Sequence, residues 1–146
     1  MSEETIDVEA QVRALNKALR LQLRSALQYA LTGGSIIGFE YQGLSQALGE
    51  FALADLEDAR HLVEKITSLG GDPTQDVAPL KFHEDARKAV EWLIESETEA
   101  LEALQAAIEP TGREAASEAI EHRLEHMIMR KQEQVDLLLR ASRPRS

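Results

Sequence analysis

Hydrophobic residues recur along this chain at spacings of three and four, the period of an α-helix with one buried face. Gly33-Gly34, Gly70-Gly71-Asp72-Pro73 and Pro110-Thr111-Gly112 interrupt the pattern, so we expect helices to end at these points. Thr5 or Asp7 can cap the first helix. The pattern predicts an all-α protein of one domain, residues 1–146, with helices over about 7–33, 40–69, 83–108 and 113–141.

The segment between the second and third predicted helices, residues 71–81, contains Pro73 and Pro79 and has no helical pattern. Fully extended, it reaches roughly 35 to 40 Å at about 3.3 Å per residue, close to the length of one helix. It can therefore carry the chain back along the bundle and leave the second and third helices parallel. We expect a four-helix bundle with one long crossover.

The composition agrees with a helical protein and excludes several classes of partner. Hydrophobic residues make up 43% of the chain, charged residues 29% and aromatic residues only 4%. A net charge of -10 repels phosphate backbones and anionic membranes, so we expect neither a nucleic acid nor a membrane as partner. No run approaches 18 uninterrupted apolar residues, the N-terminus lacks an apolar signal region, and there is no cysteine. We expect a cytoplasmic protein.

Polar residues interrupt the apolar face of every predicted helix, where charged side chains are costly to bury unless they are paired, hydrogen-bonded or bound to a metal. The interruptions are Gln22, Asp55, Asp58, Glu97, Lys131 and Gln134. Their spacing repeats: the first precedes the two aspartates by 33 and 36 residues, and Glu97 precedes the last two by 34 and 37. Antiparallel packing within each half then places all six in one layer at mid-bundle.

Three stretches carry a family resemblance: Leu15-Asn16-Lys17 leading to Gln28-Tyr29, Asp58-Ala59 through Glu64-Lys65-Ile66, and Leu69-Gly70-Gly71-Asp72-Pro73. With them the chain resembles the bacterioferritin branch of the ferritin-like proteins, without a gap over residues 12–80 and less closely over 90–138. That family surrounds two irons with a Glu on helices one and three and a Glu-x-x-His pair on helices two and four.

The resemblance implies a metal centre at the six positions of the layer, with altered chemistry. In chain order they hold Gln, Asp, Asp, Glu, Lys and Gln, where the family has Glu, Glu, His, Glu, Glu and His. Only Glu97 keeps the family's ligand. The family's haem-binding Met falls at Leu56, so we predict no haem. The family's short fifth helix is missing, which favours a homodimer over a cage.

The charges of the layer limit what it can bind. Its three carboxylates and one lysine carry a net charge of two negative units, and Lys131 can replace one cation by pairing with Glu97 or Asp55. The remaining charge suits at most one divalent ion, Fe, Mn, Mg or Ca, with oxygen ligands. The leading hypothesis is a bacterioferritin-like protein of the iron-handling lineage whose di-iron ferroxidase centre is degraded and whose ferroxidase activity is lost.

Two other functions stay open: an active iron oxidase or storage protein with an altered metal site, and a metal-free helical scaffold or interaction module in which the layer is a hydrogen-bonded network. Tyr29, close to Gln22 on the first helix, is either a redox tyrosine or, as we favour, a hydrogen-bond donor to the layer. A second candidate metal site is His122 with His126, at i and i+4 on the fourth helix and pointing nearly opposite to Lys131.

Overall fold

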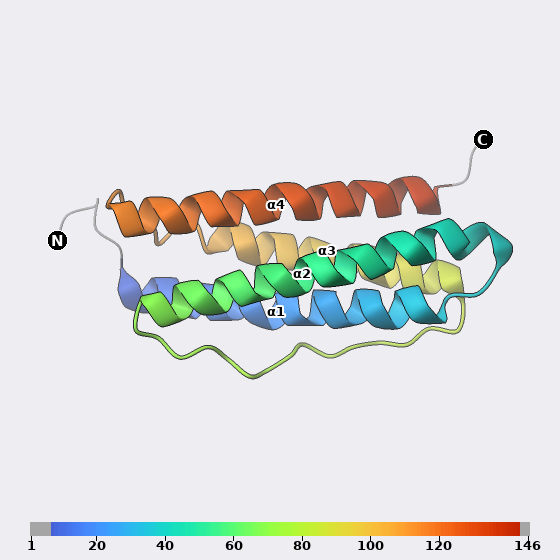
Figure 1. The fold of residues 1–146 in the computed structure, drawn as a ribbon, viewed down its shortest axis with the longest axis horizontal. Coiled ribbons are helices and arrows are strands. Elements are labelled where there is room, and N and C mark those ends of the chain that lie inside the picture. The colour runs from blue at the N-terminus through green and yellow to red at the C-terminus, as the bar shows by residue number, and fades with distance from the viewer. Residues whose placement is uncertain (1–6, 144–146) are drawn as a thin grey trace.

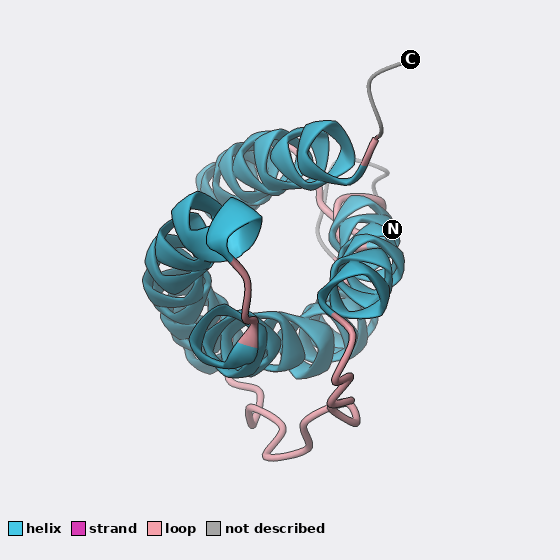
Figure 2. Cartoon of the chain, turned by 90° about the vertical axis from the view of Figure 1, so that its right-hand side faces the viewer, coloured by secondary structure: helices cyan, strands magenta, loops and turns pink. Residues whose placement is uncertain are grey.

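A computed structural model describes residues 7–143 and contains four long helices (Figure 1). They are α1 Val8–Ser35, α2 Gln42–Ser68, α3 Ala86–Ala106 and α4 Ala115–Ser142, with a short 3-10 helix, η1 Phe39–Tyr41, before α2. The segment after α2 runs back beside the bundle, so α2 and α3 point in the same direction (Figure 1). Viewed along their length, the helices surround a common centre (Figure 2). The predicted all-α, four-helix bundle with one long crossover is confirmed.

The helix ends follow local capping, and some differ from the prediction. Asp7 caps α1 by accepting a hydrogen bond of 3.1 Å from the Ala10 backbone N–H. Thr5, the other predicted cap, lies outside the described residues. The third helix begins at Ala86 instead of about 83, because the Asp85 side chain accepts from the Arg87 backbone N–H and caps it there.

Gly33-Gly34 does not end α1, which was the prediction; the helix continues to Ser35. Gly33 instead lets two helices approach closely. A Cβ atom at this position would lie 3.0 Å from the Cβ of Leu48 on α2, a distance shorter than nine in ten real Cβ contacts. The glycine is therefore an α1–α2 packing residue, and helical packing overrides its tendency to end the helix.

The crossover is fastened along α1 by side chains of that helix. Asn16 donates to the carbonyl of Asp72 at 3.0 Å and accepts from the N–H of Thr74 at 2.8 Å. Further along, Gln28 donates to the carbonyl of Lys81 at 2.8 Å and accepts from its N–H at 3.0 Å. The extended segment thus satisfies backbone polar groups without forming a helix or strand of its own.

The buried apolar residues form two clusters, one toward each end of the bundle. Leu19, Leu62 and Leu104 belong to the first cluster, and Leu48 and Leu93 to the second. The polar positions of the predicted layer fall between these clusters along each helix. None of the helices formed by the described residues combines the length and apolar character needed to cross a membrane.

Candidate metal centre

A buried lysine joins three helices at mid-bundle. Lys131 on α4 donates to Glu97 Oε2 on α3 at 2.7 Å and to Asp55 Oδ2 on α2 at 3.2 Å. The lysine and aspartate side chains are each 1% exposed and the glutamate side chain is 0% exposed. Charge-assisted hydrogen bonds of this length in a water-excluded site are strong, and each neutralises part of a charge that would otherwise be costly to bury.

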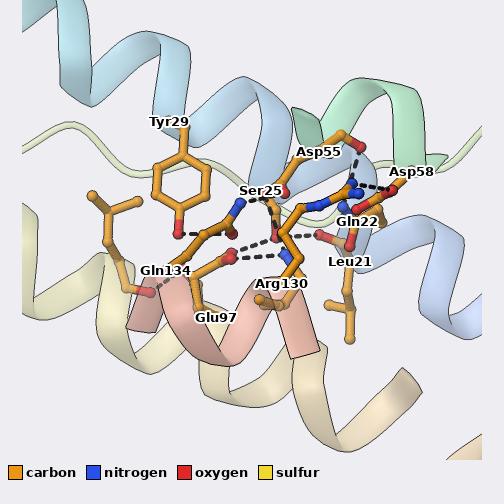
Figure 3. A network of polar contacts seen from close by, with 12 residues as sticks. Leu21, Gln22, Ser25, Tyr29, Asp55, Asp58, Glu97, Arg130 and Gln134 are labelled. Atoms are coloured by element: carbon orange, nitrogen blue, oxygen red, sulfur yellow. Dashed lines mark hydrogen bonds and ion pairs between the residues drawn. The ribbon is translucent and has the colours of Figure 1, made fainter. Parts of the chain in front are cut away.

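Gln134 extends this network along α4. Its Nε2 donates to Asp55 Oδ1 at 3.0 Å, so both oxygens of that carboxylate are engaged. Its Oε1 accepts from the hydroxyl of Tyr29 on α1 at 3.4 Å (Figure 3). Tyr29 is therefore placed as a hydrogen-bond donor, and its ring also meets the edge of Phe51 with centroids 5.4 Å apart.

Gln22 and Asp58 reach the layer differently from the other four residues. Gln22 donates through Nε2 to the backbone carbonyl of Asp55 at 3.1 Å, while its Oε1 is buried and has no hydrogen-bond partner among the described residues. Asp58 turns outward to the guanidinium of Arg130, with an Nη1 to Oδ1 distance of 2.7 Å (Figure 3). The structure thus joins four of the six predicted side chains directly, and Asp58 is paired elsewhere.

Two residues of the network were missed by the sequence analysis. Ser25 donates to Glu97 Oε1 at 2.5 Å and so occupies the second oxygen of that carboxylate. Arg130 neutralises Asp58. Ser25 lies three residues after Gln22 on the same helix face, so helical spacing could have identified it as a member of the layer. Arg130 sits beside the inward Lys131 and is half exposed, so periodicity alone does not mark it.

Burial is the largest single influence on the side-chain pKa values in the layer. It raises the pKa of Asp55 to about 6, although Lys131 acts in the opposite direction. Burial likewise raises the pKa of Asp58 against the effect of Arg130. For Lys131, burial lowers the pKa, but Glu97 and Asp55 outweigh it and the net shift is upward. Burial and the nearby Glu97 hold the pKa of Tyr29 well above its usual range. The lysine is therefore charged at neutral pH.

Hydrogen bonds already engage most of the carboxylate oxygens that a metal would need. Both oxygens of Asp55 and of Glu97 accept hydrogen bonds, and one oxygen of Asp58 faces Arg130. Gln22 Oε1 is the one side-chain oxygen of the six that is buried and unpartnered. Within residues 7–143, no group of three or more His, Cys, Asp or Glu side chains is arranged to hold a metal ion. The residues present do not fit a pair of irons as they stand.

The second candidate site lies on the surface. His122 and His126 are both exposed on α4, whereas Lys131 of the same helix is buried. The pair therefore sits apart from the layer. Its use as a metal site stays a prediction.

The chain matches a known protein family. Residues 12–140 match the ferritin-like domain family. The chain belongs to this family. None of the curated proteins matches this ferritin-like chain significantly.

Solved structures of ferritin-like proteins superimpose closely. A ferritin-like diiron-carboxylate protein from Bacillus anthracis has a TM-score of 0.85 and 25% identity over 98% of this chain and 100% of that one. A dodecameric thioferritin from Bacteroides fragilis, a bacterioferritin-related protein, has a TM-score of 0.84 and 18% identity over 94% of this chain and 86% of that one. Rhodobacter capsulatus bacterioferritin, in a structure with a metal-free dinuclear site and haem iron, has a TM-score of 0.76 and 22% identity over 92% of this chain and 83% of that one. The predicted resemblance to ferritin-like proteins is confirmed.

Proposed function

We propose that this ferritin-like protein has lost di-iron ferroxidase chemistry and carries a fixed internal cation, the Lys131 ammonium, where its family binds metal. The supporting observation is the position of Nζ, 2.7 Å from Glu97 and 3.2 Å from Asp55, with all three side chains buried. Ion pairs of this kind neutralise the carboxylates that would otherwise attract a divalent cation. The protein would then serve as a helical module derived from an iron-handling lineage.

The remaining acceptors support at most one metal ion. Gln22 Oε1 is buried without a partner, and the Asp58 carboxylate uses one oxygen for Arg130. Amide and carboxylate oxygens are ligands for hard cations such as Mg, Ca and Mn, and they also bind ferrous iron. Leu56 offers no ligand atom, so we also propose that haem is not bound.

Self-association through the outer face of α1 and α2 is part of this proposal. Leu27 on α1 and Leu53 and Leu56 on α2 are each about half exposed or more, an unusual density of exposed leucine for a monomer surface. The two helices bring these leucines to similar heights, because Gln22 contacts Asp55 and Gly33 contacts Leu48. Such a face favours a homodimer. The structural neighbour from Bacteroides fragilis is described as dodecameric.

A pair of variants tests the replacement of metal by lysine. Lys131→Glu combined with Gln134→His removes the ammonium and supplies a carboxylate and an imidazole at one turn of α4, the spacing that suits metal ligation. We expect this double variant to bind more iron per chain than the unaltered protein. The measurement is elemental analysis after anaerobic ferrous loading and desalting.

Lys131→Gln is the matched control, because it removes the ammonium but adds neither the carboxylate nor the imidazole. It should take up less iron than the double variant. Circular dichroism before and after loading separates a folding defect from a binding defect. Unchanged uptake by a folded double variant would count against the layer as a former metal site.

A further inference from the structure

The outer face of α4 carries two histidines and a methionine that the buried layer does not use. His122, His126 and Met129 stand at i, i+4 and i+7 of the continuous helix Ala115–Ser142. At roughly 100° per residue they fall within a sector of about 60° on one side of the helix. All three are exposed. Figure 1 shows α4 on the side of the bundle away from the crossover, so solvent reaches this face.

The two histidines have no partner within the part of the chain that the structure describes. Neither His122 nor His126 forms a hydrogen bond or ion pair there. His61 on α2 differs, because its Nδ1 lies 3.1 Å from Glu64 and its Nε2 lies 3.6 Å from Glu57. Two imidazoles at i and i+4 on a helix, each with a nitrogen available, form a chelating pair for a metal ion.

Met129 is exposed where methionine is usually buried. Its exposed fraction is 56%, whereas that of Met127, two residues earlier on the same helix, is 1%. Long side chains in an α-helix point toward its N-terminus, so the thioether of Met129 leans toward His126. The methionine therefore adds a soft sulfur ligand to the two imidazoles.

We propose that His122, His126 and Met129 bind one copper(I) ion on the outer face of α4. Thioether sulfur selects copper(I) over harder ions, and neutral imidazole is a common ligand for copper. The site needs no third His, Cys, Asp or Glu ligand, and residues 7–143 supply none here. Lys131 of the same helix is 1% exposed, so this face is separate from the layer. Copper would bind whether or not the layer holds a metal.

The charges around the site favour a cation. Arg123 is exposed beside the first histidine, and the guanidinium of Arg130 is already paired with Asp58 at 2.7 Å. Carboxylates outnumber the remaining arginine within residues 118–126 and raise the local concentration of cations. They are Glu118, Glu121 and Glu125.

Competition for copper(I) tests the site. The full-length chain is titrated without oxygen against the coloured bicinchoninate complex of copper(I), and transfer is read from the loss of colour. We expect one copper per unaltered chain. His122→Gln combined with His126→Gln should weaken binding by at least about a hundredfold, because both nitrogen ligands are lost. His83→Gln, which removes a histidine outside α4, is the matched control and should bind copper as the unaltered protein does.

Met129→Leu tests the choice of metal, because it keeps an apolar side chain of similar size but removes the sulfur. It should weaken copper(I) binding by about tenfold and leave zinc binding unchanged, since zinc rarely uses thioether ligands. In NMR spectra, the Met129 methyl signal should move on addition of copper(I) and the Met127 signal should not. The variants change exposed side chains, so circular dichroism should show an intact bundle.

Two results would overturn the proposal. Equal copper(I) affinity of the unaltered chain and the folded double histidine variant would place any bound copper elsewhere. Unchanged copper(I) affinity of Met129→Leu, with a stationary Met129 methyl signal, would exclude the sulfur as a ligand and with it the selection of copper(I).

Discussion

Lys131 has the surroundings that a buried ammonium requires. Two carboxylates accept hydrogen bonds from its N–H groups, and the second oxygen of each carboxylate accepts a hydrogen bond from Ser25 or Gln134. Removing one partner of such a set leaves an uncompensated buried charge, which costs about 3 to 5 kcal/mol. The layer therefore acts as one unit, and the chemistry of each residue depends on the others.

The pH dependence of stability isolates Asp55 within this unit. Its folded pKa of about 6 lies above the usual value near 4, so at intermediate pH the native state holds a proton that the unfolded state has lost. The stability that Asp55 contributes must then increase as the pH falls from about 7 toward 4. A group with a depressed pKa would give the opposite slope.

Asp55→Asn removes this titration. We expect the free energy of unfolding of the unaltered protein, minus that of the variant, to be larger near pH 4 than near pH 7, by about 1 to 3 kcal/mol. Urea unfolding across this range gives the difference. A value that stays constant, or falls with decreasing pH, would contradict a buried Asp55 with a raised pKa.

At the scale of elements, α1 organises the bundle by holding both α2 and the crossover. Gln28 is one residue of α1 that holds the crossover. It forms hydrogen bonds with the backbone N–H and C=O of Lys81, and it accepts a hydrogen bond from the indole N–H of Trp92 on α3 at 3.2 Å. The Lys81 ammonium lies 4.2 Å from the centre of the Trp92 ring, which adds a cation–π contact. One glutamine therefore fastens the end of the crossover to two helices.

Gln28→Ala should loosen this fastening. Loss of the four hydrogen bonds of the Gln28 side chain, the fourth being to the Thr32 hydroxyl, is expected to cost roughly 2 to 4 kcal/mol. It should also shift the emission of Trp92, the single tryptophan, to longer wavelength and speed amide exchange at Lys81. Gln132→Ala, which removes one exposed bond to Asp136, is the control and should change stability by less than about 0.5 kcal/mol. If both variants unfold alike and Trp92 emission is unchanged, Gln28 does not anchor the crossover.

At the scale of the whole molecule, helical periodicity and the length of one irregular segment were sufficient to predict the bundle and its crossover. The polar interruptions of the apolar faces also predicted the layer, because charged side chains rarely face a core without partners. The pairing of Asp58 with Arg130 was not predictable, because a half-exposed arginine lies outside the periodic pattern of buried positions. The predicted end of the first helix at Gly33-Gly34 differs from the observed end at Ser35 for a related reason. The role of Gly33 depends on its packing against Leu48 of another helix, which the local sequence does not reveal.

The leucine face of α1 and α2 also belongs to this scale. Leu27, Leu53 and Leu56 are exposed, and the proposed homodimer would bury them between two chains related by symmetry.

The metal content of the unaltered protein tests the central proposal most directly. The protein is loaded with ferrous iron without oxygen, passed through a desalting column and analysed for iron per chain. A buried Lys131 ammonium between Asp55 and Glu97 predicts one iron or fewer per chain. Two irons per chain would contradict it.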